Sequence, residues 1–316
     1  MARMTLDQLE IFLAVANHLH FTRAAEDLYI TQPSVSVAVQ NLEVQYGVRL
    51  FDRIGRRIEL TDAGKLLQQE AAKIFEQVQL VERGLKELND LHKGEIRLGA
   101  SQTIGSYWLP QFISQFKQDY PGIRVNCTLG NTQEIGMGTV DGRFDLGIVE
   151  GKVEPAVAGM LTQSIVGSDR LQIVVGRSHP WFQQSEVAFT ELVKTDWVMR
   201  ESGSGTREQF EQALFQWGIE LADLEIILEL KNGEMIKVIV ENGRSAAAIS
   251  NLIVSKELQL KTLHAIKITE DRHSTNPDLD PMIRPFYLIK HRERFQTRVS
   301  QVFEQLLTDR ITAQLT

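Results

Sequence analysis

The chain has 316 residues, 43% hydrophobic and 24% charged, which is enough apolar material for about two folded domains of ordinary size. This composition excludes a disordered tail, a collagen-like rod and a disulfide-stabilised scaffold, since Cys127 is the only cysteine. The net charge of −7 argues against bulk nucleic-acid binding, but residues 49–57 carry four arginines against one aspartate. Any contact with nucleic acid should therefore be confined to a small N-terminal surface.

The sequence also bears on where the protein works. The first residues lack the basic start, the continuous apolar run and the small-residue cleavage site of a secretory signal. No apolar stretch approaches the roughly 18 residues that a membrane-spanning helix needs. With the lone cysteine, these features predict a protein of the reducing cytoplasm.

Three helical patterns open the chain. Thr5 and Gln8 have the spacing of a capping box, and an apolar stripe predicts a helix over residues 5–17. Thr22 is expected to cap a short second helix, and Thr31, followed by Pro33, to cap a third. The third helix would bury Val35, Val39 and Leu42 and leave short polar side chains outside, namely Gln32, Ser34, Ser36 and Gln40. Two helices joined by a tight turn, the second exposing polar groups, indicate a helix-turn-helix unit.

Residues 51–60 alternate apolar and polar side chains around Gly55 and predict a β-hairpin. Arg53, Arg56 and Arg57 would lie on its solvent side. A single arginine is usually a solvated surface charge, but beside a helix-turn-helix unit phosphate contact is the favoured interpretation.

Several motifs in this region occur in a fixed order: Phe-Thr-Arg-Ala-Ala-Glu at 21–26, Thr-Gln-Pro-Ser-Val-Ser at 31–36, Leu-Glu at 42–43, Leu-Phe-Asp-Arg at 50–53 and Leu-Thr-Asp-Ala-Gly at 60–64. Together they resemble the winged helix-turn-helix of LysR-type transcriptional regulators. The expected contacts to double-stranded DNA are Thr22, Thr31, Gln32, Ser34, Ser36, Gln40, Arg53, Arg56 and Arg57. Many members of the family carry a basic residue early in the third helix, whereas this helix has no Lys or Arg. We therefore expect glutamine–adenine and methyl contacts rather than guanine readout by arginine.

Residues 61–92 predict one long helix. Apolar residues recur in it at alternating spacings of four and three, at Leu67, Ala71, Ile74, Val78, Val81, Leu85 and Leu88. This heptad seam favours pairing with a second helix over packing on the body of its own chain. A helix of roughly 30 residues would be about 45 Å long, enough to hold two winged modules apart on one duplex. The resemblance implies the same dimerising linker, with a hinge at Lys93-Gly94.

Beyond Gly94, short apolar strands at 96–99, 125–129, 144–149 and 171–175 alternate with helices, which predicts an α/β fold with a mostly parallel sheet. Ligands of such sheets bind at the carboxyl ends of the strands. Small polar residues gather at four strand ends along this region: Ser101, Gln102 and Thr103; Asn131 and Thr132; Glu150 and Gly151; and Ser202, Gly203, Ser204, Gly205 and Thr206. Taken singly, these are plain loops and helix caps. Taken together, with a glycine-rich loop that opens a helix, they predict a site for a small anion.

The family resemblance continues through the C-terminal part, at Gly-Ala-Ser-Gln-Thr-Ile-Gly (99–105), Leu-Pro (109–110), Tyr-Pro (120–121), Asp-Leu-Gly (145–147) and His-Pro (179–180). It implies two α/β subdomains similar to periplasmic solute-binding proteins, with the effector in the cleft. The expected effector contacts are Ser101, Thr103, Asn131, Thr132, Glu150 and residues 202–206. The polar residues at the strand ends are most similar to members that govern assimilation of inorganic carbon, sulfur or nitrogen.

The expected organisation is a DNA-binding domain over 1–61, a linker helix over 62–92 and an effector region over 93–316. Subdomain I would take about 93–165 and 290–316, and subdomain II about 166–289. Residues 273–285 look like an inserted polar loop before a strand at 286–289.

A metabolic enzyme or a solute-binding protein built on the same cleft is the alternative. The seven histidines (18, 20, 92, 179, 264, 273 and 291) lack metal-ligand spacing, and Cys127 is expected to be an inert core thiol. No nucleophile elbow, dinucleotide fingerprint or nucleoside-triphosphate loop occurs, and no cofactor is expected. We predict a ligand-responsive regulator, expected to be an activator, that binds promoter DNA and a small anionic metabolite. The family implies a homotetramer that contacts RNA polymerase.

Overall fold

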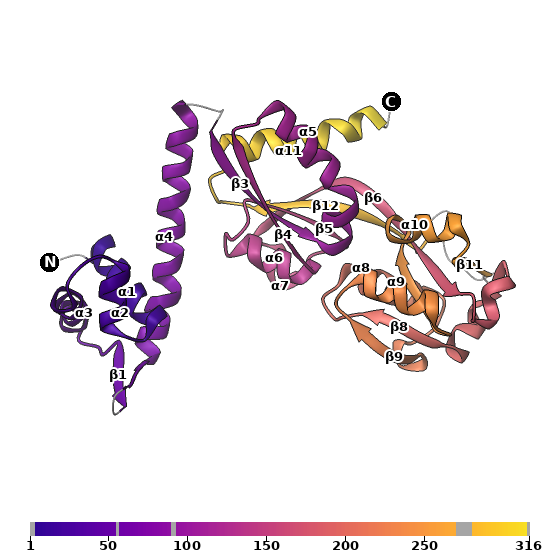
Figure 1. Cartoon of the computed structure of the whole chain (residues 1–316), viewed down its shortest axis with the longest axis horizontal. Helices are drawn as coiled ribbons and strands as arrows, with labels where there is room; N and C mark the ends of the chain where they lie inside the picture. The colour runs from indigo at the N-terminus through magenta and orange to yellow at the C-terminus, as the bar shows by residue number, and fades with distance from the viewer. Residues whose placement is uncertain (1–3, 55–56, 90–92, 270–279, 315–316) are drawn as a thin grey trace. The chain divides into compact units, whose positions relative to one another are not determined.

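The computed structural model describes residues 4–54, 57–89, 93–269 and 280–314 (Figure 1). The chain forms two compact units, residues 1–85 and 86–316, and each is described by itself. No helix in the described ranges is both long enough and apolar enough to cross a membrane.

The first unit contains three helices and a hairpin, α1 (Leu6–His18), α2 (Phe21–Asp27), α3 (Gln32–Tyr46), β1 (Phe51–Ile54) and β2 (Arg57–Leu60). The strands pair antiparallel from Phe51 opposite Leu60 to Ile54 opposite Arg57, so the predicted hairpin is confirmed. Phe12, Val35 and Leu42 are buried in the core that joins the helices to the base of the hairpin.

The caps of these helices follow the sequence with one exception. The capping box is present, with Gln8 N–H donating to Thr5 Oγ1 at 3.2 Å and Thr5 N–H to Gln8 Oε1 at 3.0 Å. Thr31 caps α3 as predicted, accepting from Ser34 N–H at 3.3 Å. The prediction that Thr22 caps α2 is wrong. The helix already begins at Phe21, whose ring packs against the core, and His20 Nδ1 accepts from Arg23 N–H at 3.3 Å.

Helix α4 (Asp62–Asn89) has 28 residues and is therefore about 42 Å long. Near its start Leu67 packs against the winged core, and Ala71 is buried. Further along the seam, Ile74, Val81 and Leu85 are exposed. Much of the apolar seam beyond the winged core is therefore left open to solvent.

The second unit is built on one long mixed sheet. Its helices and strands, in chain order, are β3 (Gly94–Ser101), η1 (Ile104–Trp108), α5 (Pro110–Asp119), β4 (Ile123–Gly130), α6 (Thr132–Val140), β5 (Leu146–Glu150), α7 (Pro155–Ala158), β6 (Leu161–Gly176), η2 (Pro180–Gln183), β7 (Glu186–Ala188), η3 (Phe189–Lys194), β8 (Asp196–Arg200), α8 (Gly205–Gln216), η4 (Leu221–Asp223), β9 (Glu225–Leu230), α9 (Gly233–Asn242), β10 (Ala246–Ser250), α10 (Asn251–Leu260), β11 (Leu263–Thr269), β12 (Ile283–His291) and α11 (Arg298–Gln314). The strand order is β4-β3-β5-β12-β6-β10-β8-β9, with β11 beside β6 and β7.

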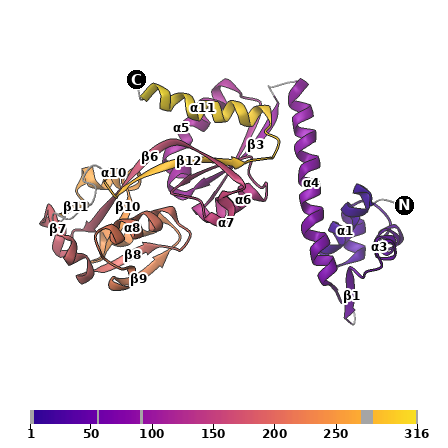
Figure 2. The same cartoon turned by 180° about the vertical axis from the view of Figure 1, so that it is seen from behind.

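Two strands cross between the halves of this unit. β3 is parallel to β4 and β5, and β8 is parallel to β9 and β10, as the α/β prediction requires. β6 and β12 run antiparallel to one another and lie side by side from one half to the other in both views (Figure 1, Figure 2). Subdomain I contains β3, β4 and β5, and subdomain II contains β8, β9 and β10. The fold is therefore the expected pair of α/β subdomains.

The core of subdomain I includes Phe286 and Leu288 of β12, so this strand packs with the first subdomain, whereas the sequence-based division placed it with the second. The predicted loop over 273–285 also ends earlier than expected. Residues 270–279 lie outside the described ranges, but β12 already begins at Ile283.

Cys127 was expected in a core, and this prediction is wrong. β4 is the edge strand of the sheet, and Cys127 is exposed there. At the edge of a sheet no further element has to cover the face that carries Cys127. An apolar pattern in such a strand therefore does not ensure that its side chains are buried.

Candidate functional site

The first candidate site is the outer face of α3. Thr31, Gln32, Ser34 and Gln40 are exposed there, and Ser36 is half-buried. Gln32 Nε2 donates to Ser36 Oγ at 2.8 Å, and the hydroxyls of Thr31 and Ser34 lie 2.8 Å apart. Four of these side chains are therefore paired along the helix face, and the bond to Ser36 leaves the second Nε2–H and the Oε1 of Gln32 available to a base.

The hairpin beside α3 bears the predicted wing arginines. Arg57 is exposed at the start of β2. Arg53 lies in β1 opposite Ile58, and Arg56 lies outside the described residues. Thr22 is exposed on α2, and so is Arg23 next to it, a cation that the sequence analysis did not select.

The second candidate site lies at the carboxyl ends of the strands of subdomain I. Ser101 ends β3 opposite Gly130 of β4, and Glu150 ends β5 on the other side of β3. The sheet therefore brings Ser101, Asn131 and Glu150 to one edge. From subdomain II, the loop over 201–204 leads from β8 into α8.

The loop of subdomain II touches this edge directly. Asn131 Nδ2 donates to Glu201 Oε1 at 3.2 Å, and Gln133 N–H donates to the Gly203 carbonyl at 3.2 Å. A Cβ at residue 205 would lie 1.9 Å from the Glu150 carbonyl oxygen, so only glycine permits this approach. The two subdomains are therefore in contact at the predicted site.

Three hydroxyls at this place have no partner. Ser101 and Thr103 of subdomain I and Ser204 of subdomain II are each at most 3% exposed, and their side-chain oxygens make no hydrogen bond. Ser204 occupies the N-cap position of α8 without bonding to its own helix. Because buried hydroxyls are normally satisfied, these three call for a partner that the protein does not supply.

The other predicted residues already have partners within the protein. Thr132 Oγ1 donates to the Glu150 carbonyl at 2.8 Å, and Asn131 Oδ1 caps α6 by accepting from Glu134 N–H at 2.9 Å. Thr206 Oγ1 accepts from Arg284 at 2.8 Å. These residues hold the edge together in the structure.

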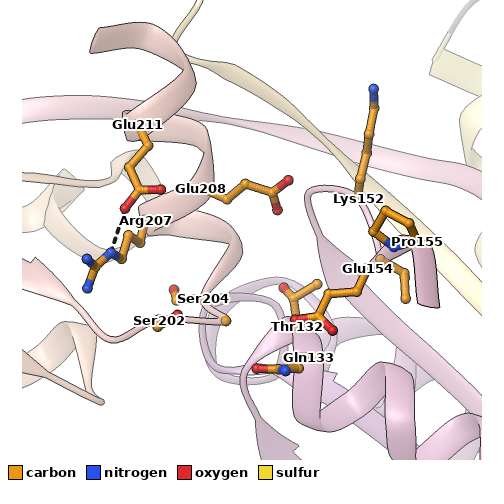
Figure 3. Close-up of a pocket in the computed structure, with 12 residues that line it drawn as sticks. Thr132, Gln133, Lys152, Glu154, Pro155, Ser202, Ser204, Arg207, Glu208 and Glu211 are labelled. Carbon is orange, nitrogen blue, oxygen red and sulfur yellow. Dashed lines mark hydrogen bonds and ion pairs between the residues drawn. The ribbon is translucent and has the colours of Figure 1, made fainter. Parts of the chain in front are cut away.

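A pocket of about 350 Å³ opens beside the loop, between the start of α6, residues 152–155 and the first turns of α8 (Figure 3). Of the predicted effector contacts, Thr132, Ser202, Gly203 and Ser204 line it. Ser101, Thr103, Asn131, Glu150, Gly205 and Thr206 do not.

Charged side chains that the sequence analysis missed also line the pocket. Glu208 points from α8 toward Lys152 and Glu154 (Figure 3). Burial raises the pKa of Glu208, Lys152 lowers it, and the nearby glutamates raise it further. Arg207 is held by Glu211 at 2.6 Å. Residues 207–211 are an ordinary charged helix turn in the sequence, so only the fold indicates that they face a pocket.

A fully buried arginine was also missed, because it lies within the segment 273–285 that the sequence analysis interpreted as a polar loop. Arg284 of β12 pairs with Asp169 at 2.9 Å and lies 3.5 Å from Glu150. With its bond to Thr206, it links both crossing strands to residues of the candidate site. In the described ranges no group of three or more potential ligands could hold a metal ion.

Comparison with known proteins agrees with this architecture. The model of the LysR substrate binding domain matches residues 89–312, and that of the bacterial regulatory helix-turn-helix protein, lysR family, matches residues 6–65. A probable RuBisCO transcriptional regulator of Synechocystis sp. is 37% identical over 279 residues, covering 88% of this chain and 81% of its own. One of Trichormus variabilis is 35% identical over 305 residues, covering 95% and 87%.

Solved structures share the fold. CbnR in complex with its target DNA has a TM-score of 0.69 at 20% identity, covering 97% of this chain and 99% of that one. The regulatory domain of Synechocystis CcmR, in complex with 2-PG, has a TM-score of 0.58 at 24% identity, covering 68% and 96%. With family models over both parts and relatives above 30% identity along nearly the whole length, the chain belongs to the LysR family of DNA-binding transcriptional regulators.

Proposed function

We propose that the C-terminal region binds a small anionic metabolite between its subdomains and that this binding controls transcription of carbon-assimilation genes. The observation that carries the proposal is the set of three buried, unpartnered hydroxyls, Ser101, Thr103 and Ser204, contributed by both subdomains. A ligand shifts a conformational equilibrium only through different affinity for the two states, so contacts from both sides suit a sensor.

The three buried hydroxyls and their surroundings suit an anionic ligand. Ser204 is the N-cap residue of α8, a helix of 12 residues whose first turn offers backbone N–H groups and the positive end of its dipole. The hydroxyls of Ser101 and Thr103 add neutral donors. Glu208 opposes an anion when ionised, but its raised pKa makes the neutral form easier to reach.

The names of the similar proteins indicate which genes this regulator controls. Several are named probable RuBisCO transcriptional regulators, and the CcmR regulatory domain was solved in complex with 2-PG. By analogy, we assign this regulator to carbon assimilation, with a phosphorylated or carboxylated metabolite as effector. We also infer an activator that works in the cytoplasm with RNA polymerase. No observation favours an enzyme or a free solute-binding protein.

DNA binding is assigned to α3 and the hairpin, with Gln32, Ser34, Ser36 and Gln40 reading bases and the wing arginines contacting phosphates. The exposed seam of α4 supports pairing of two chains, and we propose a homotetramer made from such dimers.

Titration calorimetry of the full-length protein with 2-PG tests the effector site. Thr103→Val removes one hydroxyl without changing size much and should weaken binding about tenfold or more, since a bond to a charged group is lost. Thr190→Val is the matched control, because Thr190 is exposed on η3. Equal affinities for the two variants and the wild type would contradict the site. DNA retention should persist in both variants.

A further inference from the structure

Tyr29 stands out in the turn between α2 and α3. Its φ of +55° lies in the left-handed region, which a bulky side chain rarely adopts, and its side chain is 96% exposed. The turn itself explains the backbone conformation. Tyr29 N–H donates to the Glu26 carbonyl at 3.2 Å and Ile30 N–H to the Ala25 carbonyl at 3.0 Å, a helix ending at which glycine or asparagine is usual.

The fold has no use for a tyrosine at this place. The phenol ring packs against nothing in the winged core. Glycine would adopt the same φ at no steric cost, so the side chain adds strain to the turn. Leu19 and Lys261 adopt the same backbone region, but Tyr29 combines it with a bulky aromatic ring that is almost fully exposed. Strained residues cluster at functional sites, and a ring with no contact inside the protein is available to a partner outside it.

The position of the turn identifies that partner. Thr31, two residues later, caps α3, so Tyr29 sits at the entry to the helix that carries Gln32 and Ser34. When such a helix enters the major groove by its N-terminal end, the turn before it lies against the sugar–phosphate backbone. Tyrosine hydroxyls are common donors to DNA phosphates. A neutral anchor at this place also suits a helix that has no Lys or Arg.

We propose that Tyr29 positions α3 on DNA by donating a hydrogen bond from its phenol hydroxyl to a backbone phosphate. The contact reads no base, so it adds similar affinity for every sequence. Because the phenol is neutral, it displaces no counterion, and the salt dependence of binding is unchanged by its loss, unlike the loss of an arginine contact.

The test uses the full-length protein and two duplexes, one selected by the wild type from a random-sequence pool and one of random sequence. Tyr29→Phe should weaken binding to both by about two- to tenfold, the usual range for one hydrogen bond, with the same salt slope. Tyr29→Gly should weaken binding at least as much while raising the Tm, because the strain is relieved. Tyr46→Phe, a second exposed tyrosine at the far end of α3, should bind as wild type.

The outcomes separate a DNA contact from a structural role. Wild-type affinity of Tyr29→Phe would overturn the proposal. So would a Tyr29→Gly variant that loses affinity together with a lower Tm, since that would show a purely structural turn residue. Loss confined to the selected duplex would assign Tyr29 to base reading, and a changed salt slope would assign it to an ionic network; either result overturns the phosphate contact.

Discussion

Gly205 offers the sharpest test of the contact between the subdomains. In Gly205→Ala the new Cβ would start 1.9 Å from the Glu150 carbonyl oxygen and 2.9 Å from Thr132 Oγ1. A carbon and a carbonyl oxygen need about 3.3 Å, so the loop must retreat by about 1.4 Å. Neither group can move aside easily, because the Glu150 oxygen belongs to the backbone and the Thr132 hydroxyl is held by its hydrogen bond to that oxygen. The Gln133–Gly203 bond, at 3.2 Å, does not survive such a shift.

Overpacking of this kind costs about 1–3 kcal/mol, and here it destabilises the arrangement in which the two subdomains touch. Affinity for an effector that needs both subdomains should therefore fall about 5- to 150-fold. Calorimetry of the full-length protein with 2-PG measures this loss, and a gel-shift assay should show unchanged DNA affinity.

Gly159→Ala is the matched control, because a Cβ there meets nothing within 4 Å and the backbone φ of −64° suits alanine. If Gly205→Ala binds the effector as tightly as Gly159→Ala does, the close approach of the loop to Glu150 has no part in binding. If both variants lose DNA affinity, the defect is in folding and the reasoning fails.

Three further predictions concern the wing, the linker and the pocket. Arg57→Ala should weaken all DNA sequences alike and reduce the salt slope by about one, and unchanged affinity at every salt concentration would remove the wing from the interface. Val78→Asp combined with Val81→Asp should dissociate dimers, because two charges would enter the paired seam; a native oligomer in sedimentation would place the seam on the chain's own body instead. Glu208→Gln should bind 2-PG more tightly than wild type at pH 8, and this advantage should shrink as the pH falls. The pKa of Glu208 is raised by burial, so the wild type neutralises this repulsive carboxylate at a higher pH than an ordinary glutamate does, and an affinity ratio that stays constant as the pH falls would contradict its role.

The sequence was sufficient where local chemistry decides the structure. Capping at Thr5 and Thr31, the hairpin around Gly55 and the strand–helix alternation depend on residues a few positions apart, and the structure agrees with each. It was insufficient for Thr22, because the choice between two neighbouring caps depends on whether Phe21 reaches the core.

Properties set by distant partners could not be predicted. Cys127 shares one face of its strand with Val125 and Leu129, which predicts burial, but its exposure depends on β4 being an edge strand. β6 was expected over 171–175 yet runs from Leu161 to Gly176, because it pairs with β12 in one subdomain and β10 in the other. Likewise the strand ends indicated an effector site, whereas Arg284 and Glu208 were brought to it only by the fold.

The crossing of β6 and β12 also sets an order for folding during synthesis. Subdomain II is one continuous stretch, whereas the core of subdomain I needs Phe286 of β12 and Phe303 of α11 beside Phe116. A ribosome therefore releases the first half of that core long before its second half exists. Subdomain II can fold meanwhile, and its folding brings the ends of β6 and β12 together. The two halves of subdomain I are then joined by a folded subdomain rather than by a long flexible chain, which lowers the entropic cost of bringing them together. The last helix to be made then completes the first subdomain to be started.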